Sequence, residues 1–208
     1  MIQSRLLDIA IREFGIKGLE GASTRGIAQA AGTAMSSITY HYGGKEGLYL
    51  AAADRIAEHM AETMAEPLAD EQSIETDDAD GARAGIHNIL RRLADKMASD
   101  ANTEWTLFIL REQMRPTAAF DRIYGGVMGQ MVDTLASLIC VATGVREIRT
   151  ARIATITLAG QVLGLRAMRA TCLRLLDRET LTADDIADIK ARIDANIDAI
   201  LDSMQGTA

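Results

Sequence analysis

Residues 24–48 read TRGIAQAAGTAMSSITYHYGGKEGL, and this stretch decides the fold of the N-terminal part of the chain. Ser23 and Thr24 are candidate N-caps for a short helix over 25–31. Gly32 ends this helix, and after a tight turn the pattern predicts a second short helix over 34–42. Gly43 and Gly44 end the second helix. Two short helices joined by a turn of three or four residues are typical of a helix-turn-helix.

The residues before this stretch add a first helix over 4–17. Its apolar side chains fall on one stripe at helical spacing, and Gly18 provides a stop. Three short helices in this order predict a compact head of the helix-turn-helix type. Periodicity alone leaves an ordinary three-helix bundle as an alternative.

The rest of the chain shows further helical patterns and no strand pattern. They cover residues 45–66, 81–99, 103–115, 117–143, 146–176 and 184–204. Residues 67–80 are acidic and aperiodic, which predicts a solvated loop. We therefore expect an all-α protein with a helix-turn-helix DNA-binding domain over 1–48 and a helical ligand-binding and dimerisation domain over 49–208.

Composition and charge limit the possible classes. The chain has 208 residues, of which 48% are hydrophobic, so it has enough apolar side chains to form a core. Its N-terminus lacks the apolar run of a signal peptide, and its longest apolar stretch, 153–165, is too short to span a bilayer. Two cysteines make no disulfide framework. We expect a soluble, cytoplasmic protein with no membrane partner.

The net charge of −7 is uneven along the chain. Residues 1–50 hold five basic and four acidic side chains, a net charge of +1, whereas the remainder carries −8. The net charge of a whole chain says little about one small binding face. The charge distribution therefore allows a DNA-binding head without predicting one.

The motifs in residues 24–48 resemble the DNA-binding head of TetR-family transcriptional regulators. That family has T-x-x-x-I-A-x-x-A-G, then a recognition helix ending in Y-x-H/Y-F, then K-E-x-L. This chain departs from the pattern at Thr33-Ala34, Ser36, Thr39 and Tyr42, where the family usually has Val-Ser, Gly, Tyr and Phe. The spacing Glu112-x-x-x-Pro116-x-x-x-Phe120-x-x-x-Tyr124 is also similar to the C-terminal domain of the CecR-like subgroup.

The predicted DNA-contacting residues lie at helix starts and along the recognition helix. Free N–H groups at a helix N-terminus bind phosphate, and small hydroxyl side chains allow close approach to base edges. The set is Thr24, Arg25, Met35, Ser36, Ser37, Thr39, Tyr40, His41 and Lys45. No Arg, Lys, Asn or Gln lies between Met35 and His41, so we expect DNA shape and apolar contacts to carry much of the specificity.

Two further sets of residues are predicted in the C-terminal part. The effector site is expected where aromatic and Met side chains cluster with a few polar anchors. Its members are Trp105, Phe108, Arg111, Glu112, Phe120, Tyr124 and Met128, with a filled core as the alternative. The last two helices are expected to form a four-helix bundle with a second copy, with the monomer's own core as the alternative. The interface residues are Ile156, Val162, Leu163, Ile193, Ile197 and Ile200.

The resemblance implies a ligand-responsive regulator of transcription, usually a repressor. Such a protein binds a pseudo-palindromic double-stranded DNA operator as a homodimer, and here a small hydrophobic or aromatic effector would release it. No pattern of catalytic residues, metal ligands or cofactor-binding residues is present in the sequence. The alternatives are a helical dimeric adaptor whose head binds protein, or a small-molecule enzyme.

Overall fold

The computed structural model describes residues 2–99 and 103–205, and all regular secondary structure in these ranges is helical. The predicted all-α class is therefore confirmed. The chain divides into two compact units. The first comprises Met1–Ala65 and Asn102–Gln130, and the second comprises Glu66–Ala101 and Met131–Ala208. The contacts thus place residues 49–65 and 102–130 with the head, beyond the functional boundary predicted after residue 48.

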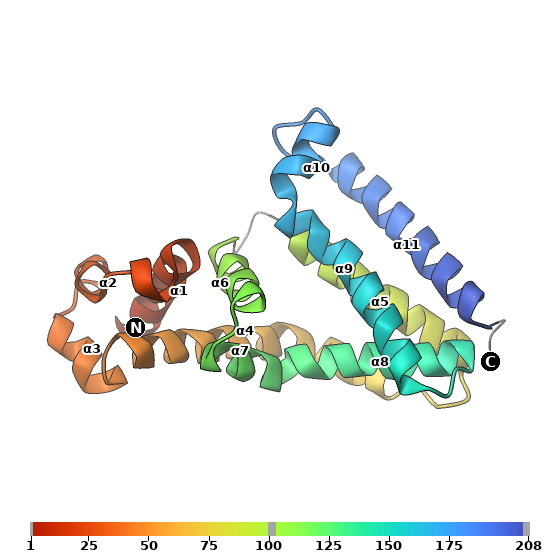
Figure 1. Ribbon diagram of the computed structural model, residues 1–208, viewed down its shortest axis with the longest axis horizontal. Helices are drawn as coiled ribbons and strands as arrows, with labels where there is room; N and C mark the ends of the chain where they lie inside the picture. Colours follow the sequence, from red (N-terminus) through yellow and green to blue (C-terminus); the bar gives the residue numbers. More distant parts are fainter. Residues whose placement is uncertain (1, 100–102, 206–208) are drawn as a thin grey trace. The chain divides into compact units, whose positions relative to one another are not determined.

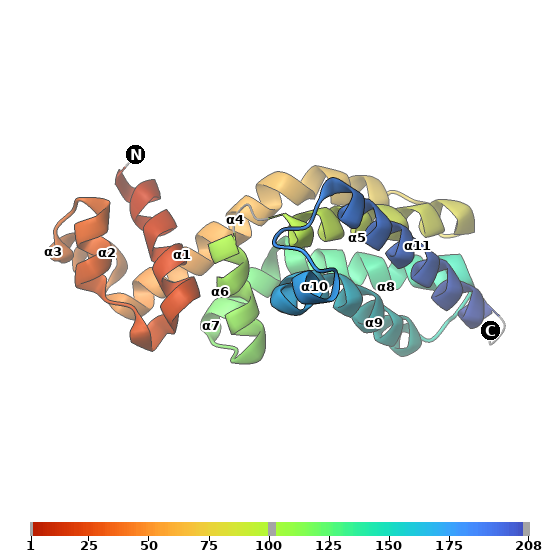
Figure 2. The same ribbon diagram turned by 90° about the horizontal axis from the view of Figure 1, so that it is seen from above.

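The first unit contains the three short helices of the head (Figures 1 and 2). Its elements are α1 (Ile2–Gly21), α2 (Thr24–Ala31), α3 (Met35–Tyr42), the first part of α4 (Lys45–Gln72), α6 (Thr103–Met114), α7 (Ala118–Ile123) and the π-helix η1 (Tyr124–Met128). Apolar side chains from α1 to α4 and from α6 share one core. Its largest fully buried members include Phe14, Ile27, Ile38, Leu48 and Phe108.

Helix α1 packs extensively against α6 in this unit. A Cβ atom on Gly15 would lie 2.4 Å from the backbone oxygen of Glu104, so only glycine allows the two helices to approach this closely. Gly18, the predicted stop, has a φ of 74° and kinks α1, but the helix continues to Gly21. The predicted end of the first helix, at residue 17, was therefore four residues early, while the break in its geometry was placed correctly.

The second unit contains α5 (Ala79–Ala98), most of α8 (Gly129–Thr143), α9 (Ile148–Ala167), α10 (Arg169–Leu175) and α11 (Ala183–Gln205). Helices α5 and α9 lie side by side, and α11 packs on both of them (Figure 1). Thr182 caps α11, since its Oγ1 accepts from the N–H of Asp185 while Asp185 Oδ2 accepts from the N–H of Thr182. This reciprocal pair of hydrogen bonds fixes the start of α11.

The prediction of a helix over 45–66 followed by a loop over 67–80 was wrong. Helix α4 runs to Gln72 with Pro67 inside it, and α5 begins at Ala79. Leu68 and Glu71 are both buried, so packing of this last part of α4 outweighs the hydrogen bond that proline removes. Asp78 caps α5 by accepting from the N–H of Gly81 at 2.8 Å.

The glycines at 125, 126 and 129 divide the long helix predicted over 117–143. Gly126 has non-helical backbone angles within η1, and η1 separates α7 from α8. A Cβ on Gly129 would lie 2.5 Å from the carbonyl oxygen of Tyr124. By length and composition alone, the stretch Ala118–Thr143 is apolar and long enough to cross a membrane, and half of its most apolar window is buried inside the protein. The helix predicted over 146–176 is similarly divided at Met168 into α9 and α10.

Candidate nucleic-acid interface

Helix α2 begins with a hydrogen-bonded cap. Ser23 is the N-cap, and its Oγ accepts from the N–H of Gly26 at 3.3 Å. Thr24 is therefore the first helical residue, half-buried, and Arg25 beside it is exposed. Because Ser23 satisfies one of the free N–H groups, the hydroxyl of Thr24 is not used as the cap and remains at the helix start with the Arg25 guanidinium.

Helix α3 begins without a side-chain cap. Its N-cap position is Ala34, while the hydroxyl of Thr33 donates to Ser37 Oγ at 3.2 Å. At Thr33-Ala34, where the TetR family usually has Val-Ser, this chain thus has no side-chain cap. The first turn of α3 therefore keeps N–H groups that no side chain of the helix start satisfies, which suits binding of an anion such as phosphate.

The remaining surface of α3 is open to solvent. Tyr40 is 85% exposed, Met35 is 50% exposed, and Ser36, Thr39 and His41 are also exposed. Ile38, in contrast, is buried. Tyr42 is half-buried, and this burial raises the pKa of its hydroxyl. The helix thus has one anchored side and one side formed by small hydroxyls and an exposed aromatic ring.

The turn between α3 and α4 depends on glycine. Gly43 and Gly44 have φ values of 74° and 121°, which side chains rarely adopt. A Cβ on Gly47 would lie 1.6 Å from the carbonyl oxygen of Tyr42, so the first turn of α4 passes directly against the end of α3. Lys45, the first residue of α4, donates from Nζ to the backbone oxygen of Glu20 at 3.0 Å.

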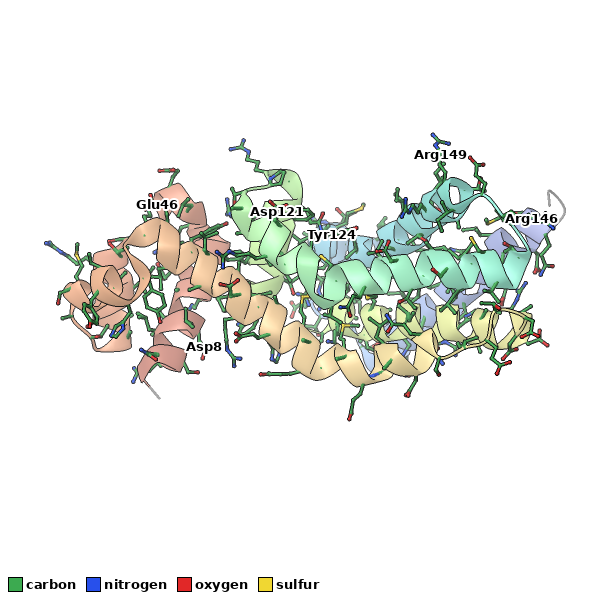
Figure 3. All side chains as sticks on the ribbon, turned by 90° about the horizontal axis from the view of Figure 1, so that it is seen from below. Asp8, Glu46, Asp121, Tyr124, Arg146 and Arg149 are labelled. Carbon is green, nitrogen blue, oxygen red and sulfur yellow. The ribbon has the colours of Figure 1, made fainter. Side chains whose placement is uncertain are left out.

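All nine predicted DNA-contacting residues lie on three successive elements of the first unit. Six are exposed, and Thr24, Ser37 and Lys45 are half-buried. The acids Asp8 and Glu46, labelled in Figure 3, are exposed on the same unit and lie outside the predicted set. The structure therefore leaves the whole predicted set accessible, while contact with DNA itself stays a prediction.

The predicted effector residues also lie in the first unit. Phe108 is fully buried and stacks on Tyr49, with ring centroids 4.6 Å apart. Arg111 donates to the backbone oxygens of Gly15 and Ile16, just before the kink of α1 at Gly18. These two side chains thus hold α6 against the head, a role that the sequence did not reveal because it did not show which helix packs against α6.

The other predicted effector residues are more accessible. Trp105 is half-buried against the ring of His59, and Met128 is half-buried at the end of η1. Phe120 stacks on Tyr124, which is 41% exposed and is labelled in Figure 3. These four are the members of the predicted set that retain surface for a ligand.

Glu112 is the centre of a buried polar network. Its carboxylate is 1% exposed and accepts from the Tyr49 hydroxyl at 2.6 Å and from the N–H and hydroxyl of Thr117, both at 2.9 Å. Burial, followed by the hydrogen bond and charge of Glu112, raises the pKa of Tyr49. Tyr49 was not among the residues predicted from the sequence. Tyr49 lies between inward-facing apolar residues of α4, so the spacing of this helix could have predicted that its side chain is buried. A buried hydroxyl needs a hydrogen-bond partner, which would have indicated a polar contact at this position.

The predicted interface residues of the last two helices have different surroundings. Val162, Ile193 and Ile197 are buried inside the second unit, so they cannot supply the surface of an interface in this form of the protomer. Ile156 is 69% exposed, and Leu163 and Ile200 are half-buried. The spacing of isoleucines in α11 showed that this helix has an apolar side, but the protomer's own helices α5 and α9 cover that side.

Two family descriptions match the chain. Residues 6–52 match the description "Bacterial regulatory proteins, tetR family". Residues 82–204 match "HTH-type transcriptional dual regulator CecR, C-terminal domain". The chain is 31% identical to the HTH-type transcriptional dual regulator CecR of Shigella flexneri over 206 residues, which cover 97% of this chain and 92% of that protein.

Solved structures share the fold. A TetR-like transcriptional regulator from a Rhodococcus species superposes with a TM-score of 0.62 at 16% identity, covering 95% of this chain and 96% of that one. AibR in complex with isovaleryl coenzyme A and operator DNA gives 0.64 at 17% identity, covering 93% and 96%. The matches to the N-terminal and C-terminal parts of the chain agree with the match to a relative over nearly its whole length. TetR-family proteins are ligand-responsive, DNA-binding transcriptional regulators and are not enzymes. The chain therefore belongs to the TetR family, and its C-terminal domain is of the CecR type.

Proposed function

We propose that this protein is a cytoplasmic repressor that binds a pseudo-palindromic operator as a homodimer and is released by a small hydrophobic or aromatic effector. Helix α3 of each protomer enters the major groove, and the two copies occupy grooves about 34 Å apart. Thr24, Arg25 and Lys45 hold phosphates, and the exposed side of α3 reads the bases. The single observation that carries this proposal is the 85% exposure of Tyr40 on an anchored helix.

The base-reading side of α3 has a distinct chemistry. Met35 and Tyr40 provide apolar contact surface, which fits thymine methyl groups, and Ser36, Ser37 and Thr39 provide hydroxyls. No side chain from Met35 to His41 makes the bidentate contacts that read guanine or adenine most strongly. We expect an operator whose recognition depends on A·T-rich steps and on groove shape.

The experiment is an electrophoretic mobility shift followed by footprinting on the DNA upstream of the protein's own gene. The expected result is a protected site with two symmetric halves, one helical turn apart. A random duplex of equal length is the control. Failure to prefer any genomic fragment over this duplex would favour the alternative of an adaptor whose head binds protein.

The homodimer is proposed to form through the outer side of α9. Ile153 and Ile156 are exposed there, and a Cβ added to Gly160 or Gly164 would meet no atom within 4 Å. Two small residues one turn apart let a second helix approach closely, and the flanking isoleucines supply the apolar area. Arg146, just before this helix, and Arg149, in its first turn, are exposed and labelled in Figure 3, and they would form a charged edge to the contact.

The effector is proposed to contact the accessible aromatic group formed by Trp105, Phe120, Tyr124 and Met128. Rings and a flexible thioether suit a planar or apolar small molecule. The isovaleryl coenzyme A bound by AibR supports an effector-responsive form of this fold. Operator binding measured against a panel of small aromatic and acyl compounds tests this proposal, and the active compound should quench the fluorescence of Trp105, the single tryptophan.

A further inference from the structure

Helices α5 and α11 carry complementary charges at the same spacing. Arg83, His87 and Arg91 recur every four residues on α5, and Asp194, Asp198 and Asp202 recur every four residues on α11. Residues four apart lie on the same side of a helix. The two rows face one another with the helices antiparallel, and we call these six side chains the charge zipper.

Each position of the charge zipper makes a specific contact. Arg83 pairs with Asp202 and, at 2.8 Å, with Asp198. Arg91 Nε lies 2.9 Å from Asp194 Oδ1 at the other end. One further turn along, the signs reverse, and Lys190 of α11 donates to Asp95 of α5 at 2.7 Å.

His87 occupies the middle of the zipper and contacts two carboxylates. Its Nδ1 lies 3.0 Å from Asp194 Oδ1, and its Nε2 lies 3.0 Å from Asp198 Oδ1. Only 13% of its side chain is exposed. Carboxylate oxygens are acceptors, so both ring nitrogens can donate only when the ring carries two protons and a positive charge. In the neutral ring, one nitrogen lone pair would face a carboxylate oxygen at hydrogen-bond distance.

The charges around His87 come from three helices. On α5 they are Arg83, Arg91 and Asp95, and on α11 they are the three aspartates of the zipper and Lys190. Helix α9 packs against both, and its charged residues are Arg149, Arg152 and Arg166, of which only Arg166 is buried. The two carboxylates in contact with the ring are therefore its immediate charged partners, with the arginines one position away on each side.

The pKa values of the partner carboxyls agree with this arrangement. Burial raises the pKa of Asp194, but hydrogen bonds and charges from Arg91 and His87 outweigh burial and hold it below its ordinary value. The pKa of Asp198 is lowered chiefly by the hydrogen bond from His87, with Arg83 adding to the effect. Both aspartates thus stay ionised well into the acid range and remain acceptors throughout the range in which histidine titrates.

We propose that His87 makes the docking of α11 onto α5 sensitive to pH. When the His87 ring is charged, both of its nitrogens donate hydrogen bonds to aspartates of α11 and hold this helix. When the ring loses one proton, one of these hydrogen bonds is replaced by repulsion between a nitrogen lone pair and a carboxylate oxygen. Docking of α11 therefore weakens when the ring loses one of its two protons. The aspartates and the arginines keep their charge between about pH 5 and pH 8, so His87 alone supplies the response within the zipper.

This device also bears on the proposed function, on which the following consequence rests. Helix α11 packs on α9, where Asn196 donates to Gln161 at 3.0 Å. The proposed dimer surface lies on the same helix, where Gly160 directly precedes Gln161. Loosening of α11 would therefore remove support from the helix that carries this surface, and dimerisation would weaken on the alkaline side.

Hydrogen exchange on the full chain, without DNA, tests the proposal. Backbone protection factors of α11, corrected for the intrinsic pH dependence of exchange, are measured between about pH 5 and pH 8. We expect them to fall roughly two- to fivefold in the wild type, the effect that a partly exposed ion pair supports. His87→Gln should give lower protection that does not change with pH. His59→Gln, which changes a histidine of the first unit, should keep the wild-type fall.

Two results would overturn the proposal: constant α11 protection in the wild type, or an undiminished fall in His87→Gln. If His87→Gln does not fold, nitrogen-15 spectra of the wild-type imidazoles replace it, with His41→Gln and His59→Gln assigning the three rings by elimination. The His87 titration and the loss of α11 protection should then share one midpoint, and separate midpoints would contradict the proposal. Operator binding is measured separately, so failure of the proposed function would be seen independently.

Discussion

The Tyr49 hydroxyl on α4 donates to the buried Glu112 carboxylate on α6 at 2.6 Å, a hydrogen bond between residues 63 positions apart in the sequence. Tyr49→Phe would leave this carboxylate with only its two contacts from Thr117. We expect a loss of about 1–3 kcal/mol in the free energy of unfolding, because a buried charged acceptor loses a donor. Chemical denaturation checks this value. Tyr40→Phe, at an exposed position, is the control and should change stability little.

Tyr40→Ala should lower operator affinity by about tenfold, as expected when one apolar or phosphate contact is lost, at unchanged helicity. The exposed ring contributes no core packing, so circular dichroism and melting temperature should match the wild type. Tyr40→Phe separates the two roles of the side chain, since it keeps the ring and removes the hydroxyl. Wild-type affinity in Tyr40→Ala would remove this residue from the interface.

Lys45→Ala should weaken binding to all DNA sequences alike and reduce the slope of log affinity against log salt by about one unit. The same ammonium donates to the Glu20 backbone oxygen at the end of α1, so a small loss of stability is expected as well. Lys17→Ala is a matched control, because Lys17 pairs with Glu13 and lies outside the predicted set. A salt slope equal to that of the wild type would show that Lys45 serves only α1.

Ile156→Glu should shift the protein from dimer to monomer in light scattering, because it places a charge in the proposed contact on α9. The side chain is 69% exposed in the protomer, so the monomer should remain folded. Ile197→Glu is the contrasting variant. It buries an unpaired charge inside the second unit and should unfold it. A stable Ile156→Glu dimer would place the interface on another surface.

Acid should release α11 through Asp194 and Asp198. Their folded-state pKa values are depressed, so the stability they contribute is complete above the unfolded value of about 3.9 and is lost as the pH falls through the lower folded values. The double variant Asp194→Asn, Asp198→Asn should be less stable at neutral pH and should lose less stability on acidification. Denaturant titrations at several pH values below about 5 check the sign. A steeper acid dependence in the variant would contradict it.

The sequence determined the order of the helices and the local features of the head. Caps, breaker glycines and apolar spacing act between residues a few positions apart, so Gly32, Gly43 and Ile38 could be interpreted directly. The end of α4 could not, because Pro67 argues locally for a break and only the burial of Leu68 and Glu71 favours continuation.

The tertiary structure decided which apolar and polar surfaces meet. Helical periodicity shows that one side of a helix is apolar, but not whether the same protomer, a second copy or a ligand covers it. Phe108 and Glu112 therefore lie in the core of the first unit, and Ile193 and Ile197 in that of the second. The contacts of His87 with Asp194 and Asp198 likewise join residues more than a hundred positions apart, and only packing of α11 on α5 brings them together.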